Sequence, residues 1–179
     1  MTPAVANVAA VTVKLTTEQA RRMRWRAQLL GGSSLTPAEV VRRAVALQGQ
    51  DLPSVLRAIA IRSTDGTTLA DVRAAFDSGE LVRSWPMRGT LFATTPEHLA
   101  TLLHFTGERL HRAAARRRAD LGLVDDVVDT ARGALVKALE EEPLTRSEVL
   151  ALWNDAGIPT AGGRGYHLIA HFAIAGLVH

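Results

Sequence analysis

The stretch Leu35-Thr36-Pro37-Ala38-Glu39-Val40 marks the start of a helix, and its pattern returns as Leu144-Thr145-Arg146-Ser147-Glu148-Val149. In each copy the threonine can cap the helix and the glutamate three residues later can close a capping box. The apolar residues on either side can form a hydrophobic staple, and the proline of the first copy suits the first helical position. Helical spacing continues after both copies. The repeat therefore predicts two helix-turn-helix units.

The first unit is expected to end in a hairpin. The predicted helices up to that point lie at residues 16–30, at 36–47, from about 53 onward, and at 68–76. Two runs of strand character follow at 81–84 and 90–94, and residues 85–89 join them. The last three of these helices and the hairpin follow one another in the order of a winged helix. Residues 85–89 would then be the wing.

The second half is predicted to be helical. Helices are expected at 98–105, 108–121, 125–139, 145–154 and 164–175, and residues 176–179 look like the entry to a strand. We therefore expect a mainly α fold with short β-hairpins, built as tandem winged-helix units of which the second is truncated before its wing. The expected parts are a disordered tail at 1–15, a first unit at 16–95, basic connecting helices at 96–124 and an incomplete second unit at 125–179.

Composition limits the possible functions. The 179 residues include no cysteine, which excludes disulfides and thiolate metal sites and fits a reducing cytoplasm. No apolar stretch is long enough for a membrane span. The formal net charge is +3, and the densest cationic patch is the arginine-rich segment 109–118, which favours an anionic partner.

Two glutamines lie two residues apart in Leu47-Gln48-Gly49-Gln50-Asp51. If this segment is extended, Gln48 and Gln50 point to the same side and form a pair of amides. Such a pair can hold a water molecule or grip a polar substrate without carrying charge. The alternative is that Gln48 ends the helix and Gln50 lies in solvent.

Several motifs together resemble one family. They are Leu47-Gln48-Gly49-Gln50-Asp51, Leu81-Val82-Arg83-Ser84-Trp85-Pro86-Met87-Arg88-Gly89-Thr90-Leu91, Tyr166-His167-Leu168-Ile169 and Gly176-Leu177-Val178. This combination resembles the bacterial winged-helix DNA glycosylases that unhook interstrand crosslinks, the group that includes the azinomycin-resistance glycosylase. The resemblance extends from about residue 16 to the end of the chain.

The resemblance implies an activity and a site. The activity would be hydrolysis of the N-glycosidic bond of N7-alkylated guanine, including interstrand crosslinks, without a cofactor. Gln48 and Gln50 match the family's catalytic Gln-x-Gln motif. The partner would be double-stranded DNA with alkylated or crosslinked guanine, bound by a monomer in the nucleoid of the cytoplasm.

For Met87, Gly89 and Thr90 the resemblance implies a role in lining the site. Arg83, Trp85 and Arg88 near the hairpin are expected to meet phosphate and sugar, although Trp85 and Met87 can instead pack in the core. Arg164, Tyr166 and His167 begin the expected recognition helix of the second unit and would approach DNA. His167 and His171 have the spacing of a metal pair, but no third ligand is placed to complete a site, so no metal is expected.

The sequence departs from the family pattern in three respects. Phe92 stands where a histidine is common, and Gly49 stands where a larger residue is more usual. Members of the family are also about twice as long.

Two other functions remain open. The chain can be a non-catalytic winged-helix DNA-binding protein, such as a transcription regulator. It can also be an assembly domain in which Leu168, Ile169, Phe172 and Ile174 require partners from another chain.

Overall fold

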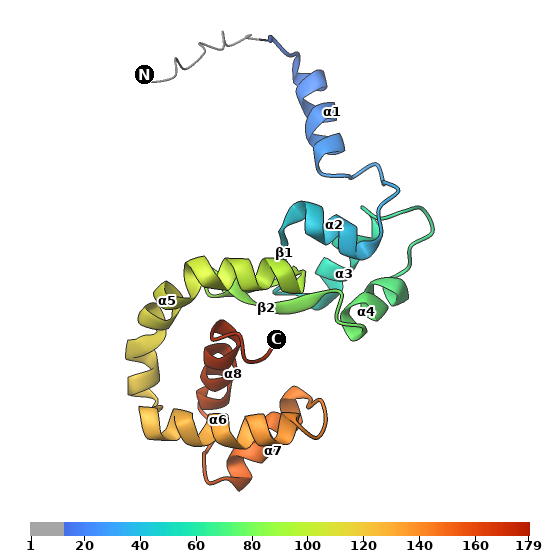
Figure 1. The fold of residues 1–179 in the computed structure, drawn as a ribbon. Coiled ribbons are helices and arrows are strands. Elements are labelled where there is room, and N and C mark those ends of the chain that lie inside the picture. Colours follow the sequence, from blue (N-terminus) through green and yellow to red (C-terminus); the bar gives the residue numbers. More distant parts are fainter. Residues whose placement is uncertain (1–12) are drawn as a thin grey trace, which may run out of the picture.

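The computed structural model describes residues 13–179, so most of the predicted disordered tail lies outside the described residues. This part of the chain forms eight helices and three short strands, and Figure 1 shows how they are arranged. Their bounds are α1 Thr17–Ala27, α2 Pro37–Ala44, β1 Ala46–Gln48, α3 Leu52–Ala60, α4 Leu69–Asp77, β2 Val82–Met87, β3 Thr90–Thr94, α5 Pro96–Asp120, α6 Asp125–Leu139, α7 Arg146–Asp155 and α8 Arg164–Ile174. The fold is mainly helical with one small antiparallel sheet, as expected.

Both predicted capping boxes form. The Thr36 side chain accepts from the Glu39 amide while the Glu39 carboxylate accepts from the Thr36 amide, and Thr145 and Glu148 do the same at α7. Each glutamate has its pKa held below the usual range by hydrogen bonds from the capping threonine. The two helix starts therefore follow from short-range sequence alone.

Helices α2, α3 and α4 enclose the first hydrophobic core. Its fully buried members include Val41, Val55, Leu56, Ile59 and Val72, which recur at helical spacing on the three helices. Ala93 of β3 and the partly buried Leu47 of β1 complete it from the sheet. This core holds the sheet against the three helices.

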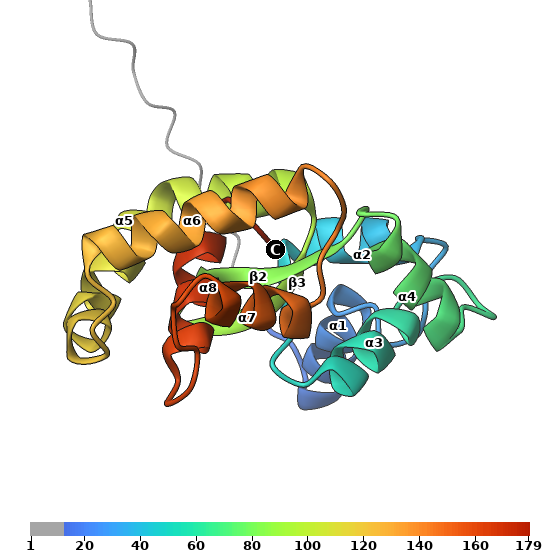
Figure 2. The ribbon, with the colours of Figure 1, turned by 90° about the horizontal axis from the view of Figure 1, so that it is seen from below.

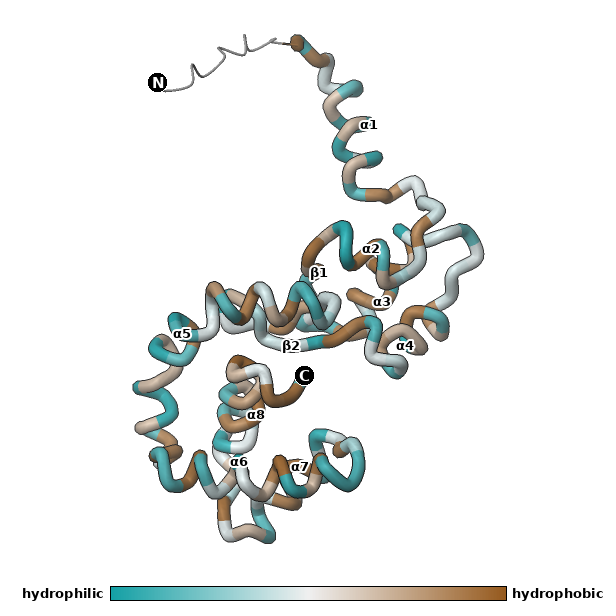
Figure 3. The backbone as a smooth tube through the Cα atoms, viewed as in Figure 1, coloured by the Kyte–Doolittle hydropathy of each residue, from teal (hydrophilic) through white to brown (hydrophobic). Residues whose placement is uncertain are grey.

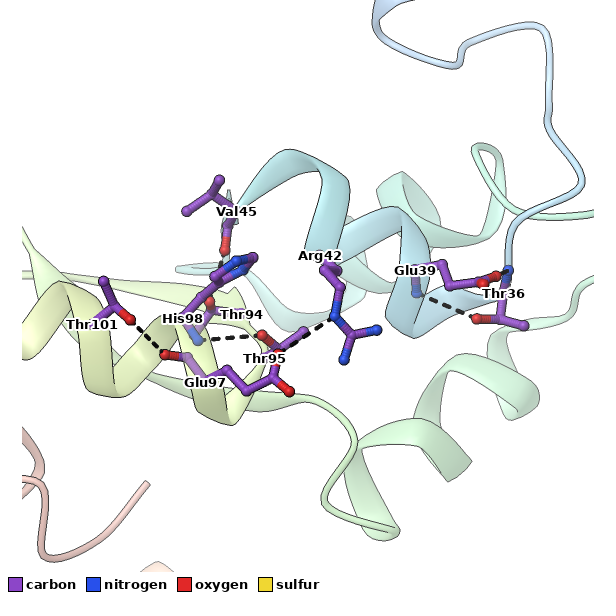
Figure 4. A network of polar contacts seen from close by, with 9 residues as sticks. All are labelled: Thr36, Glu39, Arg42, Val45, Thr94, Thr95, Glu97, His98 and Thr101. Atoms are coloured by element: carbon purple, nitrogen blue, oxygen red, sulfur yellow. Dashed lines mark hydrogen bonds and ion pairs between the residues drawn. The ribbon is translucent and has the colours of Figure 1, made fainter.

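The strand β1 corrects the sequence prediction, which extended the second helix to residue 47. The helix ends at Ala44 because Val45 takes a positive φ of 66°. The Val45 carbonyl accepts a hydrogen bond of 2.7 Å from the Thr94 hydroxyl, and Figure 4 shows this contact beside the Arg42–Glu97 ion pair. The chain then pairs with β3 through Gln48 opposite Phe92, which gives the sheet order β1-β3-β2.

The hairpin is tighter than expected. Strand β2 continues through Met87, so only Arg88 and Gly89 connect it to β3 instead of residues 85–89. Both turn residues have positive φ, 57° and 67°, as two-residue hairpin loops require. Figure 2 shows β2 extending from the α2–α4 part of the molecule toward α8.

Helix α5 is also longer than expected, because residues 96–120 form one helix and not two. Gly107, which lies between the two predicted helices, is buried inside the continuous one. A Cβ at this position would lie 3.5 Å from the Ile174 carbonyl oxygen of α8. That separation is ordinary van der Waals contact, so α8 packs directly against α5 at this position. Figure 1 shows the long helix curving around α8.

Helices α6, α7 and α8 form the second core, centred on Trp153, Leu135, Leu168 and Phe172. The Trp153 indole donates to the Ala131 carbonyl at 2.9 Å.

Residues 176–179 are not in a strand, contrary to prediction. Leu177 and Val178 pack against the second core. Figure 3 shows hydrophobic residues along α8 and at the C-terminal end. Because Leu168, Phe172 and Ile174 are buried within the chain, they do not require partners from another chain.

Helix α1 stands apart from this assembly (Figure 1). It is the helix predicted at 16–30, it is capped by Thr16, and it does not pack in a core. None of its residues is buried, and Met23 is 57% exposed. No helix in the described part of the chain is long and apolar enough to cross a membrane.

Candidate active site

A cleft of about 710 Å³ lies where the β2–β3 hairpin meets helices α6 to α8. Its polar and aromatic lining comes from Gln50, Arg83, Trp85, Arg146, Trp153, Tyr166 and His179. The remaining walls are largely aliphatic and come from α6, α7, α8 and the last residues of the chain. The cleft thus brings together Gln50, Arg83, Trp85 and Tyr166, which are predicted site residues from three separate segments.

Gln50 lies just after β1, and its side chain is fixed by β3. The last backbone hydrogen bond from this segment to β3 is donated by the Gly49 amide to the Leu91 carbonyl at 2.8 Å. The Leu91 amide then donates to Gln50 Oε1 at 3.2 Å. An amide oxygen has two lone pairs, so Oε1 can accept a second hydrogen bond from a molecule in the cleft. The exposed Gln50 amide is therefore oriented and available.

Gln48 does not share this position. Strand alternation places it with Phe92 and Ser84 on the sheet face opposite Arg83 and Ala93. Its side chain is exposed, and it is not among the residues that line the cleft. The expected pairing of the two amides on one side does not occur, because the chain bends at Gln50.

Gly49 is required by the close approach of β3. A Cβ built on Gly49 would lie 2.9 Å from the Ala93 nitrogen and 3.1 Å from the Phe92 carbonyl carbon. Both are backbone atoms, which cannot rotate away as a side chain can. The glycine therefore brings the Gln50 segment close to β3 and does not loosen it.

Arg83 holds the same segment from β2. Its Nε donates to the Gly49 carbonyl at 2.7 Å and its guanidinium NH2 donates to the Gln50 carbonyl at 3.0 Å. Burial lowers the pKa of Arg83, and the nearby Asp51 carboxylate opposes that shift. Arginine stays protonated in proteins at any working pH, so the guanidinium carries a permanent charge beside Gln50.

Two aromatic side chains meet across the cleft. The rings of Trp85 on β2 and Tyr166 on α8 are 5.9 Å apart and nearly perpendicular, with an interplanar angle of 80°. This is the edge-to-face geometry that aromatic pairs prefer. The ring centroids of Tyr166 and His167 are 5.2 Å apart, and Tyr166 remains 38% exposed. The pair joins the hairpin to the second unit beside Gln50.

Four of the predicted binding residues lie at the far end of the hairpin. Met87 and Thr90 are half-buried, whereas Arg88 and Gly89 of the turn are exposed. None of the four lines the cleft. The structure therefore places them apart from Gln50, and a role in binding DNA there stays a prediction.

Arg164 is turned inward instead of toward solvent. Its Nε donates to the Pro159 carbonyl at 2.7 Å, and its NH1 contacts the Leu121 carbonyl. This guanidinium ties the start of α8 to the end of α5. The neighbouring His167 has a lowered pKa because of burial and, secondarily, because of Arg117 and Arg118.

The cleft contains a cation that the sequence did not single out. Arg146 lines it from the first turn of α7. The only signal in the sequence is its place directly after the capping Thr145, where the first copy has Pro37. Among residues 13–179, no group of three histidine, aspartate or glutamate side chains is placed to hold a metal ion.

Comparison with known families gives the class of the protein. The family described as DNA glycosylase AlkZ-like matches residues 41–179, which include Gln48, Gln50, the hairpin and helices α5 to α8. The chain therefore belongs to the AlkZ-like DNA glycosylases. No curated protein and no solved structure matches the chain.

Proposed function

We propose that this chain acts as a monofunctional DNA glycosylase that hydrolyses the N-glycosidic bond of N7-alkylated guanine, including guanine in interstrand crosslinks. Membership of the AlkZ-like family supports a glycosylase of DNA repair. The observation that carries the proposal is the Gln50 amide, which is oriented by β3 and lies in a cleft beside Arg83, Trp85 and Tyr166.

The chemistry needs little from the protein. Alkylation at N7 makes guanine cationic, so the electron pair of the breaking C1′–N9 bond neutralises the departing base without a general acid. A water molecule adds to C1′ of the sugar and releases a proton to solvent. The remaining tasks are to position that water and to stabilise the positive charge that develops on the sugar.

Gln50 is suited to both tasks. Its Oε1 already accepts from the Leu91 amide and has a lone pair left for a hydrogen of the attacking water. The partial negative charge of the same oxygen favours the cationic sugar. Gln48 stays a catalytic candidate through the family motif alone, because it does not line the cleft.

DNA would lie against two winged-helix units in this proposal. The order α2-β1-α3-α4-β2-β3 and the sheet order β1-β3-β2 support a first winged-helix unit, and α6 to α8 would be the helical part of a second one. Four exposed arginines of α5 are available for phosphates: Arg109, Arg112, Arg116 and Arg117. Arg112 is the one of these that pairs with an acid, Glu108 at 3.6 Å.

A base-release assay tests the function. The protein is incubated with duplex DNA that carries N7-methylguanine, with a nitrogen-mustard crosslink and with undamaged DNA, and free bases are separated by chromatography. We expect release from both damaged substrates and none from undamaged DNA. No release from either damaged duplex at excess protein would refute the proposal.

The second candidate is a non-catalytic DNA-binding protein, which the exposed arginines of α5 favour independently of the cleft. It predicts a steep fall of affinity with salt, because each neutralised phosphate contributes about −0.9 to the slope of log K against log salt. Such a protein would show that slope with no base release.

A further inference from the structure

Arg83 makes an unusual pair of contacts for a residue expected to bind DNA. Its guanidinium donates to two consecutive main-chain carbonyls, those of Gly49 and Gln50, at 2.7 and 3.0 Å. These carbonyls belong to a segment more than thirty positions earlier in the chain. The donors are therefore directed at the protein backbone and not at a phosphate.

The Gly49–Asp51 segment needs these donors. The ladder between β1 and β3 ends with the bond from the Gly49 amide to the Leu91 carbonyl. The Leu91 amide, which the register places opposite Gly49, donates to the Gln50 side chain, so the Gly49 and Gln50 carbonyls lack a backbone donor from β3. A carbonyl left without a donor costs free energy where it is buried. Arg83 supplies both donors from the third strand.

The segment is also fixed on its other sides. Gly49 lies so close to β3 that a Cβ would approach the Ala93 nitrogen to 2.9 Å. Asp51 caps α3 by accepting from the Ser54 amide at 2.9 Å, and these hydrogen bonds hold its pKa below the usual range. Between these two anchors, the Arg83 guanidinium sets the direction of the Gln50 carbonyl and so of the Gln50 side chain.

We propose that Arg83 is a positioning residue for Gln50: its fork holds the Gly49 and Gln50 carbonyls so that the Gln50 amide faces the cleft with its oxygen toward Leu91. The inference rests on the proposed function for its catalytic consequence, but its structural part stands alone. It replaces the prediction that Arg83 meets DNA phosphate. Lysine cannot substitute, because a single ammonium does not reproduce a rigid two-pronged donor.

The experiment compares Arg83→Lys with Arg132→Lys. Arg132 is an exposed arginine of α6 outside the cleft, so it is a matched control for the same chemical change. The readouts are the melting temperature, the dissociation constant for damaged DNA, and the single-turnover rate of base release at saturating protein. We expect Arg83→Lys to slow release by about 10- to 100-fold, as small misplacements of a reacting group do. Affinity for DNA and its salt slope should stay as in the wild type.

A double-mutant cycle separates positioning from a general structural role. In the Gln50→Ala background, Arg83→Lys should slow release by less than about 2-fold, since effects within one unit are not additive. An equal loss in both backgrounds would overturn the inference. So would a loss that appears mainly in the dissociation constant with a smaller salt slope, because that result would assign Arg83 to a phosphate.

Hydrogen exchange tests the structural part of the proposal, which is that Arg83 holds the Gly49 and Gln50 carbonyls, whether or not base is released. Arg83→Lys should speed exchange of the Leu91 amide, which depends on the Gln50 side chain, and should leave the Ala131 region of the second core unchanged. If the wild type releases no base, the proposed function fails. The exchange result still tests whether Arg83 holds the Gly49 and Gln50 carbonyls. Unchanged exchange at Leu91 in Arg83→Lys would contradict this part of the proposal.

Discussion

Replacing Gly49 with alanine should destabilise the protein, although alanine is the smallest possible addition. The new Cβ would lie 2.9 Å from the Ala93 nitrogen and 3.1 Å from the Phe92 carbonyl carbon. Separations below 3.0 Å force a shift, and here the atoms that must move are the backbone of the central strand. Strand β1 must therefore move away from β3, which also lengthens the bond between Gln50 Oε1 and the Leu91 amide.

The size of the effect follows from this overlap. Overpacking by a methyl group in a rigid environment costs about 1–3 kcal/mol. A chain of this size loses roughly 2–4 °C in melting temperature per kcal/mol, so the expected fall is roughly 2–12 °C. Urea unfolding followed by circular dichroism gives the free energy, and calorimetry gives the melting temperature.

Gly133→Ala is the matched control. Gly133 lies within α6, and a Cβ there would meet nothing within 4 Å. Alanine should stabilise this helix by about 0.5–1 kcal/mol because of its higher helix propensity. If Gly49→Ala were as stable as the wild type while Gly133→Ala behaved as expected, the close approach of β1 and β3 would be refuted.

Two further outcomes follow from burial. Met23→Ala should change the free energy of unfolding by less than about 0.5 kcal/mol, because the side chain is 57% exposed; a loss of several kcal/mol in urea unfolding would mean that α1 packs in a core. Burial, then His111 and Arg118, lowers the pKa of His171 from 6.5 to about 4. As the pH falls, His171 is protonated in the unfolded chain before it is protonated in the folded chain. The free energy of unfolding should therefore fall as the pH drops from about 6.5 toward 4, and below that pH the contribution of His171 should level off. In His171→Phe the fall between pH 6.5 and 5 should shrink, and an unchanged pH profile would contradict the assignment.

Local signals in the sequence predicted the helix starts well. The capping boxes at Thr36 and Thr145 depend only on residues three positions away, and both form. The strand β1 was missed because three residues carry no alternating pattern, and the strand exists only through its pairing with β3, more than forty residues later. The predicted division of residues 98–121 into two helices was wrong for a related reason, since α5 is continuous where it packs against β2 and α8.

The candidate site shows the same division. Motifs and predicted elements in the sequence singled out Gln50, Arg83, Trp85 and Tyr166, and the structure brings these four to one cleft. The sequence did not show that Gln48 lies outside that cleft, because the bend at Gln50 depends on contacts with Leu91 and Arg83. Tertiary contacts of this kind produce no recognisable pattern of residue spacing in the sequence.

The most direct test of the account is the single-turnover rate of base release by Gln50→Ala, with Gln48→Ala measured beside it on the same N7-methylguanine duplex. The cleft geometry predicts that Gln50→Ala loses about 100-fold or more in rate, the size expected for a preorganised polar group at the reacting centre. Its melting temperature and affinity for DNA should be unchanged, and Gln48→Ala should lose less. Release by Gln50→Ala at the wild-type rate, or a larger loss in Gln48→Ala, would contradict the central claim that Gln50 holds the attacking water.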